Sequence, residues 1–492
     1  MMKEILNYIN GKWVKSNQSF IKKSPVNGAE IARVYEADKA MVDLAVEKAK
    51  EAFEGEWGSV SLAERCRLLR KVADIMERRS EELMLAESND VGVPYAAAKM
   101  LNVGRSAFAF RMYADEAANL FEQSYHFSPP NGGQAIHYTL RQPKGVVGAI
   151  SPWNVPLLLL VFKVAPALAM GNCVIAKPSE VTPQSATLLA EIIEEAGFPA
   201  GVFNLVHGFG ANSAGAFLTE NQDVSAFGFT GDTHTGEIIM QSAAKGVRDV
   251  CLELGGKNAG IVFSDANLDD AIAGTLRSAF TNCGQICYST ERMYVERSIF
   301  DEFVSRLGVA VSQMKIGAPD EEGIQMGPLV SHQHRDKVKS MIDKAAQDGA
   351  TFVTGGGIPQ FGDDRDQGAF IQPVVAIGLA EDADFVRKEV FGPVCHVTPF
   401  DSEEEVIKLS NNSRYGLASS IWTQNFSRAH RVAAKIRAGN VWINDWQLRE
   451  LRTPMGGVGA SGIGAQGGRV SLEFFSDLIN VTARIDSSAS KQ

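Results

Sequence analysis

The sequence predicts an α/β protein with three parts: a doubly wound parallel sheet, a second α/β unit, and a small β arm. Three observations lead to this fold class. From about residue 145, short apolar strands alternate with helical segments, as they do in parallel sheets. The alternation resumes after Glu253, and a hairpin-like segment lies between residues 124 and 141. The 492 residues, with 45% hydrophobic and 22% charged side chains, suit about three ordinary folded domains.

The first unit begins with two amphipathic helices. Residues 38–53 and 61–88 carry apolar side chains at helical spacing, which is typical of helices packed against a core. Strands and helices are then expected in alternation, with strands at 146–150, 173–176, 202–206 and 226–230, and helices at 157–170 and 183–195. Strands separated by helices of this length predict a parallel, doubly wound sheet.

The second unit repeats this pattern. It starts with a strand at 259–263 and a helix at 268–280, whose start we expect Asp265 to cap. A Pro-Pro-Asn-Gly-Gly turn at 129–133 separates two short strands and predicts a hairpin, which pairs with a strand near 480–482. The expected boundaries are residues 1–120 and 142–255 for the first unit, 256–455 for the second, and 121–141 and 472–486 for the arm, before a low-complexity tail at 487–492.

Composition excludes several classes of protein. Lys plus Arg number 48 against 58 Asp plus Glu, and the net charge of −10 argues against a nucleic-acid surface. Six cysteines without a C-x-x-C pair indicate a reduced compartment rather than a disulfide scaffold. The first ten residues have no apolar signal core, and Lys163 and Pro166 interrupt the most apolar run too early for a membrane span. We therefore expect a cytoplasmic protein with no metal site and with neither nucleic acid nor a membrane as partner.

One cysteine is a candidate nucleophile. Cys287 ends the segment Phe-Thr-Asn-Cys-Gly-Gln-Ile-Cys, in which Gly284 lets the chain turn so that a thiol can face a cleft. A lone cysteine is more often an inert core residue, and Cys283 competes for the role within the same loop. Cys173 and Cys251 lie in apolar, strand-like runs, so we expect them to be structural.

Polar side chains recur where predicted strands end or tight loops begin. Glu253 precedes two glycines that let another group approach closely, Asn154 lies in a proline-bracketed loop, and Lys177 follows the next strand. Further positions of this kind are Ser179, Glu180, Gly231, Gly236, Glu389 and Phe391. The turn between Gly231 and Gly236 leads into a helix and can present N–H groups to a phosphate. Each motif alone could be a cap, a turn or a surface pair, but together they indicate a catalytic cleft.

The order and spacing of these motifs resemble the aldehyde dehydrogenase superfamily from Tyr8–Trp13 to Ser471–Phe475. Glu-Leu-Gly-Gly-Lys at 253–257 and F-x-N-x-G-Q-x-C at 280–287 are highly specific in combination. The resemblance implies that the first unit is an NAD-binding domain and that the second is a catalytic domain. It also implies that the arm serves oligomerisation, in a homodimer or homotetramer.

The resemblance assigns chemistry to three side chains. Cys287 would attack an aldehyde to form a thiohemiacetal and, after hydride loss, a thioester. The Asn154 amide and the Cys287 backbone N–H would hold the oxyanion. Glu253 would be the general base that activates water and helps to deprotonate the thiol.

The resemblance also implies an NAD site. Lys177 and Glu180 would hold the adenosine ribose, and the carboxylate would disfavour the 2′-phosphate of NADP. Glu389 would hold the nicotinamide ribose, and Phe391 would pack near the ring. The other implied cofactor contacts are Trp153, Ser179, Gly210, Gly231, Gly236 and Leu254.

Two positions depart from the family pattern. Asp232 stands where many relatives carry Ser facing the pyrophosphate, and we expect it to cap the following helix and to turn away. Gly459 stands where relatives usually carry Lys, which puts local contacts near the C-terminus in doubt.

Within the superfamily, the chain is most similar to 2-hydroxymuconate and 2-aminomuconate semialdehyde dehydrogenases of aromatic catabolism. The segments that carry this similarity are residues 141–148, 206–220, 274–285 and 446–453. A semialdehyde of a dicarboxylic acid needs cations remote from the thiol, and Arg105 and Arg449 match positions that line the substrate tunnel. The alternative is that both are solvated surface arginines, with Arg111 and Arg452 as the nearest residues that could be mistaken for them.

Other functions compete with this hypothesis. A generic or betaine-type aldehyde dehydrogenase is the main alternative, although Arg105 argues against a cationic substrate. An esterase acting through Cys287 would not require Lys177, Glu180 or Glu389. A catalytically silent structural protein on the same fold would be free to lose Cys287 or Glu253, and the chain retains both.

Overall fold

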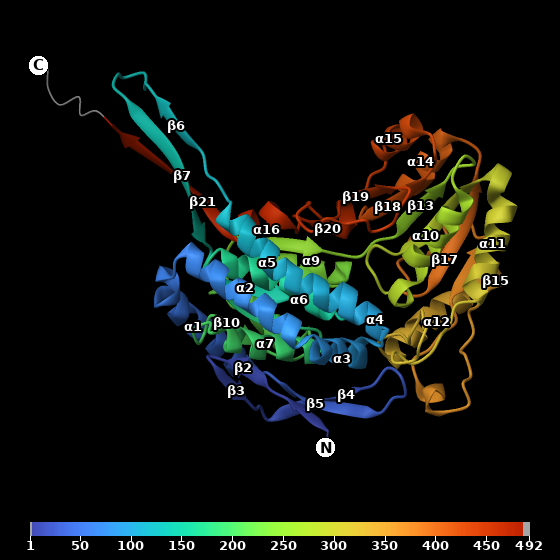
Figure 1. Cartoon of the computed structure of the whole chain (residues 1–492), viewed down its shortest axis with the longest axis horizontal. Coiled ribbons are helices and arrows are strands. Elements are labelled where there is room, and N and C mark those ends of the chain that lie inside the picture. The colour runs from blue at the N-terminus through green and yellow to red at the C-terminus, as the bar shows by residue number, and fades with distance from the viewer. Residues whose placement is uncertain (1, 486–492) are drawn as a thin grey trace, which may run out of the picture.

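A computed structural model describes residues 2–485, which form two α/β units side by side, with a β arm projecting from the first (Figure 1). The first unit contains an eight-stranded sheet of order β20-β12-β11-β8-β9-β10-β2-β3. Its five central strands are parallel, and they are β12 (Asp249–Glu253), β11 (Ala226–Thr230), β8 (Val146–Ile150), β9 (Cys173–Lys177) and β10 (Phe203–Leu205). Antiparallel strands close its edges, namely β20 (Gly462–Ile463), β2 (Asn7–Ile9) and β3 (Lys12–Val14). From β8 the chain winds first one way and then the other, which confirms the doubly wound sheet.

Helices cover both faces of this sheet. They are α1 (Lys39–Glu54), α2 (Leu62–Arg78), α3 (Ser80–Val91), α5 (Arg105–Ala118), α6 (Pro156–Ala169), α7 (Gln184–Ala196), α8 (Ala214–Glu220) and α9 (Thr233–Ala244). The single helix predicted at 61–88 is wrong, because the chain breaks at Arg79, whose guanidinium pairs with Glu191 on α7. Between α4 (Tyr95–Ala97) and α5, residues Ala98–Gly104 form a π-helical segment, a geometry that is frequent at functional sites.

The N-terminal residues also form a sheet that the sequence pattern did not predict. Strands β1 (Lys3–Ile5), β5 (Glu30–Glu36) and β4 (Gln18–Lys23) pair in the order β1-β5-β4, separate from the main sheet. These strands lie below the helices of the first unit in Figure 1.

The second unit contains a seven-stranded sheet of order β15-β16-β17-β14-β13-β18-β19. The strands are β15 (Thr351–Thr354), β16 (Val374–Ile377), β17 (Val394–Phe400), β14 (Thr290–Glu296), β13 (Asn258–Val262), β18 (Ala418–Trp422) and β19 (Asn440–Ile443), and only β15 is antiparallel. The helices are α10 (Leu268–Phe280), α11 (Phe300–Ser312), α12 (His332–Gln347), α13 (Asp384–Arg387), α14 (Glu403–Asn411) and α15 (Phe426–Ala433). The predicted cap of α10 is wrong: Asn267 caps it, whereas Asp265 binds the Thr423 hydroxyl and the Arg428 guanidinium.

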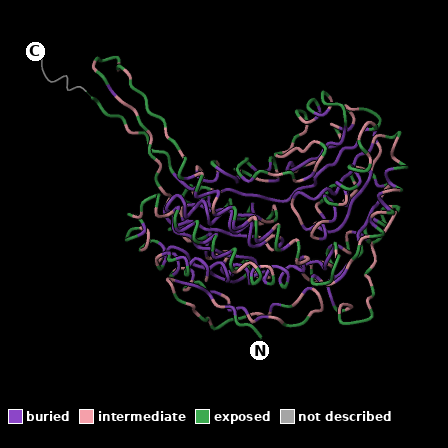
Figure 2. Tube along the Cα trace, in the orientation of Figure 1, coloured by how far each residue is buried: buried purple, intermediate pink, exposed green. Residues whose placement is uncertain are grey.

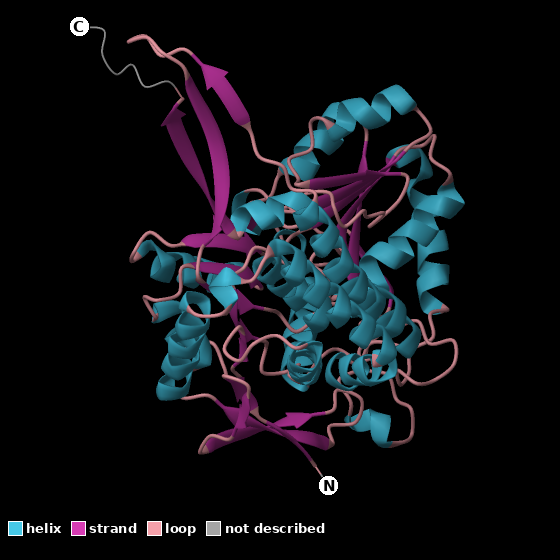
Figure 3. Ribbon diagram, turned by 60° about the vertical axis from the view of Figure 1, so that its left-hand side comes forward, coloured by secondary structure: helices cyan, strands magenta, loops and turns pink. Residues whose placement is uncertain are grey.

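The arm is a three-stranded antiparallel sheet. Strand β7 (Ala135–Pro143) pairs with β6 (Ser124–Phe127) on one side and with β21 (Ser476–Arg484) on the other, as the sequence predicted (Figure 3). Helix α16 (Gly468–Phe474), which precedes β21, packs on α5 and α6. The last residue of the predicted arm, 486, and the tail at 487–492 lie outside the described residues.

Burial follows these layers. The parallel strands and the central helices are buried, whereas much of the arm is exposed (Figure 2). Helix α6 is buried along its whole length, because the sheet lies on one side of it and other helices cover the rest. Among residues 2–485, no helix is both long and apolar enough to cross a membrane.

Candidate active site

A cavity of about 680 Å³ lies between the two units. Its walls include residues that follow the carboxyl ends of β8, β9, β11 and β12, which is where open α/β sheets bind ligands. Most of the predicted site residues line it, namely Trp153, Asn154, Lys177, Ser179, Glu180, Gly210, Gly231, Leu254, Cys287, Glu389 and Phe391. This volume lies within the range of small-molecule sites.

Cys287 reaches this cavity from the loop between α10 and β14, and it is half-buried. Asn258 holds the loop in place by donating from Nδ2 to the Cys287 carbonyl oxygen, at 2.7 Å. The preceding turn needs Gly284, which has φ +68° and on which a Cβ would overlap the Gly392 carbonyl. Cys283 is buried instead, with its thiol against the Gly327 carbonyl oxygen, so it does not compete for the role of nucleophile.

Asn154 joins the two units at the nucleophile. Its Nδ2 donates one hydrogen bond to the Gln285 carbonyl oxygen, at 2.8 Å. Asn282 of the Cys287 loop donates back to the Asn154 carbonyl oxygen, at 3.0 Å. Because a side-chain amide has two N–H donors, one of them is left to bind an oxygen on the substrate.

Glu253 has the properties of a general base. It ends β12 and is buried, and its Oε1 has no hydrogen-bond partner among the described residues. Burial raises its pKa to about 8, against the opposing charges of Lys163 and Arg449. The Cys287 thiol needs such a base, because burial and the carboxylates of Glu253 and Glu389 raise its pKa to about 12.

Lys163 is a residue whose role the sequence analysis missed. It lies on α6 and is completely buried, and its Nζ donates to the Leu159 carbonyl oxygen at 2.9 Å and to the Thr230 hydroxyl at 2.7 Å. Burial lowers its pKa to about 8, whereas Cys251, Glu253 and Cys287 act in the opposite direction. A lysine inside the most apolar run of the chain was the available signal, because such a residue is costly to bury without a purpose.

The far end of the cavity suits the adenosine half of a dinucleotide. Lys177 is buried, and its Nζ lies 3.8 Å from the Glu180 carboxylate. The Ser151 hydroxyl on the cavity wall is buried and has no partner among residues 2–485. These groups offer hydrogen bonds that the protein leaves unused, as a ribose-binding site requires.

The near end of the cavity holds Glu389 and Phe391. Glu389 accepts a hydrogen bond from Gly256 N at 2.8 Å, and a Cβ on Gly255 would overlap its carboxylate, which confirms the predicted close approach at this glycine pair. Phe391 meets Trp153 edge to face at 5.2 Å. His334 and Lys337 on α12 also line this part of the cavity, and no sequence motif had singled them out.

The start of α9 faces the middle of the cavity. Asp232 caps this helix as predicted, accepting from Thr235 N at 3.0 Å, but it remains on the cavity wall rather than turning away from it. Gly231 lines the cavity, and its N–H is used by the Glu253 carbonyl oxygen. Gly236 is not among the lining residues. A Cβ on Gly236 would lie 2.6 Å from the Leu254 side chain, so the glycine leaves space for Leu254, which does line the cavity.

The other family departure, Gly459, lies away from the lining residues. Its φ is +62°, and a Cβ would lie 2.8 Å from the Arg414 carbonyl oxygen, so the backbone there favours glycine.

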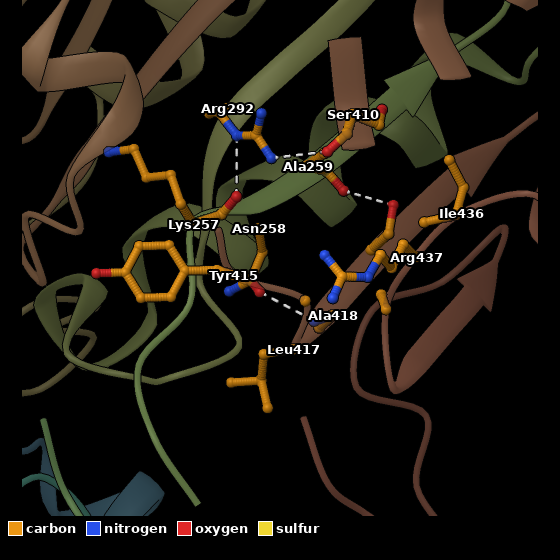
Figure 4. A pocket seen from close by; sticks show the side chains of 13 residues that line it. Lys257, Asn258, Ala259, Arg292, Ser410, Tyr415, Leu417, Ala418, Ile436 and Arg437 are labelled. Atoms are coloured by element: carbon orange, nitrogen blue, oxygen red, sulfur yellow. Dashed lines mark hydrogen bonds between the residues drawn. The ribbon is translucent and has the colours of Figure 1, made fainter. Parts of the chain in front are cut away.

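A second, much smaller cavity lies behind the Glu253–Lys257 segment, where Arg292 donates to the Lys257 carbonyl oxygen (Figure 4). Its volume of about 10 Å³ is that of a single water molecule, so it is not a substrate or cofactor site. Lys257 forms a buried ion pair with Glu291, which accepts hydrogen bonds from Val390 N and Phe391 N. This pair therefore supports the turn that carries Glu389 and Phe391.

Arg105 and Arg449 are not among the residues that line the cavity, but the charge of Arg449 acts on residues of the candidate active site. The Arg449 guanidinium lies over the Phe162 ring at 4.8 Å, and its Nε and Nη2 are buried without a partner among the described residues. Arg105 is half-buried, and both burial and the charge of Arg449 lower its pKa. The charge of Arg449 also acts on Glu253 and Cys287.

The two arginines considered as alternatives are paired. Arg111 binds Asp74 and Glu77, and Arg452 binds Glu450. Their charges are thus neutralised within the protein, whereas neither Arg105 nor Arg449 forms an ion pair with another of the residues 2–485.

Residues 13–481 match the aldehyde dehydrogenase family. The chain is 52% identical over 485 residues to a 2-aminomuconic 6-semialdehyde dehydrogenase of Pseudomonas sp, with 99% of each chain covered. It is also 52% identical to a 2-hydroxymuconic semialdehyde dehydrogenase of Pseudomonas sp. (strain CF600), covering 98% of this chain and 100% of the relative. Among solved structures, it is similar to the NAD⁺ complex of an aldehyde dehydrogenase from Bacillus cereus, with a TM-score of 0.94, 38% identity, and 98% and 97% of the two chains covered. A betaine aldehyde dehydrogenase from Staphylococcus aureus in complex with NAD⁺ superposes with the same TM-score at 35% identity, over 97% and 95%.

Proposed function

The chain belongs to the aldehyde dehydrogenase family and is an NAD-dependent enzyme, and from this premise we propose that it oxidises the semialdehyde of a dicarboxylic acid. Two relatives at 52% identity are named for 2-aminomuconic and 2-hydroxymuconic semialdehydes, and we propose a substrate of this kind. The names of the relatives do not establish the substrate of this chain. The observation that supports a dicarboxylic semialdehyde is the pair of arginines, Arg105 and Arg449.

Arg105 and Arg449 are the proposed binding site for a substrate anion. The charge of Arg449 makes that of Arg105 less favourable, and two N–H groups of Arg449 have no acceptor among residues 2–485. A carboxylate on the substrate would offset the repulsion between the two charges. It would also supply an acceptor for the two N–H groups, since carboxylates accept charge-assisted hydrogen bonds from guanidinium groups. A cationic substrate would instead add a third positive charge, so this arrangement argues against the betaine-type alternative.

The first half-reaction depends on Cys287, Asn154 and Glu253. Glu253 takes the thiol proton, and the thiolate attacks the aldehyde carbon to give a thiohemiacetal. The free N–H of the Asn154 amide and the Cys287 backbone N–H are the proposed donors to the oxyanion. Bound NAD supplies the acceptor for the hydride, and the residues proposed to hold it are Lys177, Glu180, Glu389 and Phe391.

The second half-reaction is hydrolysis of the Cys287 thioester. Glu253 removes a proton from water as the water attacks the thioester carbon, and the acid and the free thiol result. With a pKa of about 8, about a tenth of Glu253 is ionised at pH 7 and about half at pH 8, and the carboxylate is a stronger base than an ordinary Glu side chain. The positive charge of Lys163 helps to keep Glu253 ionised.

The arm supports a further part of the proposal, a homodimer or homotetramer. It exposes Tyr125, Leu140 and Leu478 on a thin three-stranded sheet, and such apolar side chains are usually covered by a partner. Strands β6 and β21 at its two edges can also pair with another chain.

NADH formation tests the substrate directly. The wild-type enzyme and the variants Arg105→Ala and Arg449→Ala are compared on a semialdehyde acid, a neutral aldehyde of equal length and betaine aldehyde. Each variant should lose about 10- to 150-fold in kcat/KM on the acid, the equivalent of roughly 1.5–3 kcal/mol, and little on the neutral aldehyde. Arg452→Ala, in the same loop as Arg449, is the matched control and should behave as wild type. Parallel losses on the acid and on the neutral aldehyde would make both arginines structural and leave a generic aldehyde dehydrogenase.

A further inference from the structure

Tyr288, the residue after the nucleophile, carries an unused hydrogen-bonding group. Its side chain is only 3% exposed. Its hydroxyl is buried and has no hydrogen-bond partner among the described residues. Buried tyrosine hydroxyls usually have a partner, because an unsatisfied polar group in the interior is unfavourable. The hydroxyl is therefore available for an acceptor that the described part of the chain does not supply.

Two tryptophans hold Tyr288 beside the segment that carries Arg449. The Tyr288 ring meets Trp442 edge to face at 5.5 Å, and Trp446 Nε1 donates to the Tyr288 carbonyl oxygen at 3.0 Å. Trp442 Nε1 donates in turn to the carbonyl oxygen of Leu448, the residue before Arg449, at 3.0 Å. The residue after the nucleophile and the segment of Arg449 are thus fixed against one another.

The electrostatics agree with this placement. Burial raises the pKa of Tyr288 well above its usual value, Arg449 lowers it, and Cys287 and Glu253 raise it further. The phenol is therefore protonated throughout the working range of the enzyme and can donate a hydrogen bond. The groups that act on the phenol are thus the nucleophile, the base and Arg449.

We propose that the Tyr288 hydroxyl donates a hydrogen bond to the substrate carboxylate that Arg105 and Arg449 bind, and that it helps to select aldehydes bearing such a group. The inference rests on the proposed function. Tyr288 and Arg449 together bring three buried donors, the phenol O–H and the Nε and Nη2 groups, for which the described part of the chain supplies no acceptor. A carboxylate can accept several hydrogen bonds at once, whereas an apolar aldehyde tail accepts none. A site built in this way rejects the analogue that leaves its donors unpaired.

The test is Tyr288→Phe, which removes one oxygen atom and keeps the ring against Trp442. On a semialdehyde acid, kcat/KM should fall about 10- to 100-fold, mainly through KM, because the carboxylate is bound equally in the ground and transition states. On a neutral aldehyde of equal length it should change less than about threefold. Tyr294→Phe is the matched control, since it removes a buried phenol hydroxyl that already has a partner in Glu381. It should leave the ratio of the two substrates unchanged.

Binding gives a second measurement that does not depend on turnover. Hexanedioate, a dicarboxylate, is titrated calorimetrically into the NAD-saturated wild-type enzyme and into Tyr288→Phe. Its Kd should rise in the variant by about the same 10- to 100-fold, while that of hexan-1-ol, which has no carboxylate, should not.

Three outcomes distinguish a failure of the inference about Tyr288 from a failure of the proposed function. If Arg449→Ala loses the preference for the acid but Tyr288→Phe keeps it, the inference fails and the proposed function stands. If neither variant changes the preference, the proposed function fails as well. If Tyr288→Phe slows both aldehydes equally, the hydroxyl serves the nucleophile or the packing around it, and the inference is again overturned.

Discussion

If the Arg449 guanidinium serves to bind a substrate carboxylate, its removal should raise the free energy of unfolding of the ligand-free protein. Arg449→Met is the informative change, because methionine preserves much of the unbranched stem and removes the charge. The structure shows what the guanidinium lacks, since Nε and Nη2 are buried without an acceptor among the described residues. The guanidinium is stabilised by its position over the Phe162 ring, with Cζ 4.8 Å from the ring centroid.

These contributions can be weighed against one another. Each buried, unsatisfied donor costs about 1–3 kcal/mol, and the charge of Arg105 adds to that cost. The stacking on Phe162 contributes about 0.5–2 kcal/mol in the opposite direction, and the attraction between the guanidinium and the Glu253 carboxylate acts in that direction too, although it is weak near pH 7, where most of Glu253 is protonated. We therefore expect Arg449→Met to raise the free energy of unfolding of the ligand-free protein by about 1–3 kcal/mol, the reverse of what most substitutions do.

The assay is denaturant-induced unfolding of the two proteins without substrate, followed by a repeat with hexanedioate. The variant should have the higher midpoint without ligand. Hexanedioate should raise the midpoint of the wild type only, because a ligand stabilises the state that binds it. Arg452→Met, which breaks an exposed pair with Glu450, is the control and should leave the midpoint unchanged. A lower midpoint for Arg449→Met than for Arg452→Met would show that the guanidinium stabilises the fold, and the reasoning about an unfilled anion site would be refuted.

The remaining predictions concern the chemistry and the cofactor. Cys287→Ala should abolish NADH formation while NAD still binds, and Cys283→Ala should stay active; substantial turnover by Cys287→Ala would contradict the thioester mechanism. Glu253→Gln should show a burst of about one NADH per active site followed by a slow steady rate, whereas equal slowing of both phases would place Glu253 in the first step alone. In the wild type, the steady rate should rise with pH through about 8, because the base acts only when it is ionised, and this rise should vanish in Glu253→Gln. Glu180→Ala should raise the KM for NAD and narrow its advantage over NADP; a wild-type enzyme that uses both equally would remove the role assigned to this carboxylate.

Much of the fold could be predicted because its signals are local. Apolar strands buried on both faces, each followed by a helix, predict a parallel sheet wherever they occur, and the helix at Leu268–Phe280 has the predicted bounds. The failures lie where a distant partner competes with the local signal. Asp265 does not cap that helix, because the Thr423 hydroxyl and Arg428, from the other end of the unit, bind it instead. The break at Arg79 likewise involves an ion pair with Glu191, which is remote in the chain.

The candidate catalytic residues could be predicted for a related reason. Cys287, Asn154 and Glu253 each lie in a short motif at a strand end or in a tight loop, and the carboxyl ends of parallel strands meet at one edge of a sheet. Lys163 and Tyr288 lie in no such motif. Their importance comes from burial and from missing or unusual partners, which are properties of the packed molecule.

The arginines show which features the sequence predicts and which depend on the tertiary structure. Sequence was sufficient for the alternation of strands and helices in the two main sheets and for a candidate nucleophile and base, since these follow from local periodicity and from short motifs. The family resemblance favoured Arg105 and Arg449 over Arg111 and Arg452, but the residues by themselves did not, because all four are simply cationic side chains in helices or loops. Only the fold decides which of them meets a carboxylate. It brings Asp74 and Glu77 to Arg111 across 37 and 34 residues of chain, whereas Arg105, whose pKa the charge of Arg449 lowers, forms no ion pair with any residue that the structure describes, and neither does Arg449. The charge that the protein does not neutralise is the charge available to a substrate.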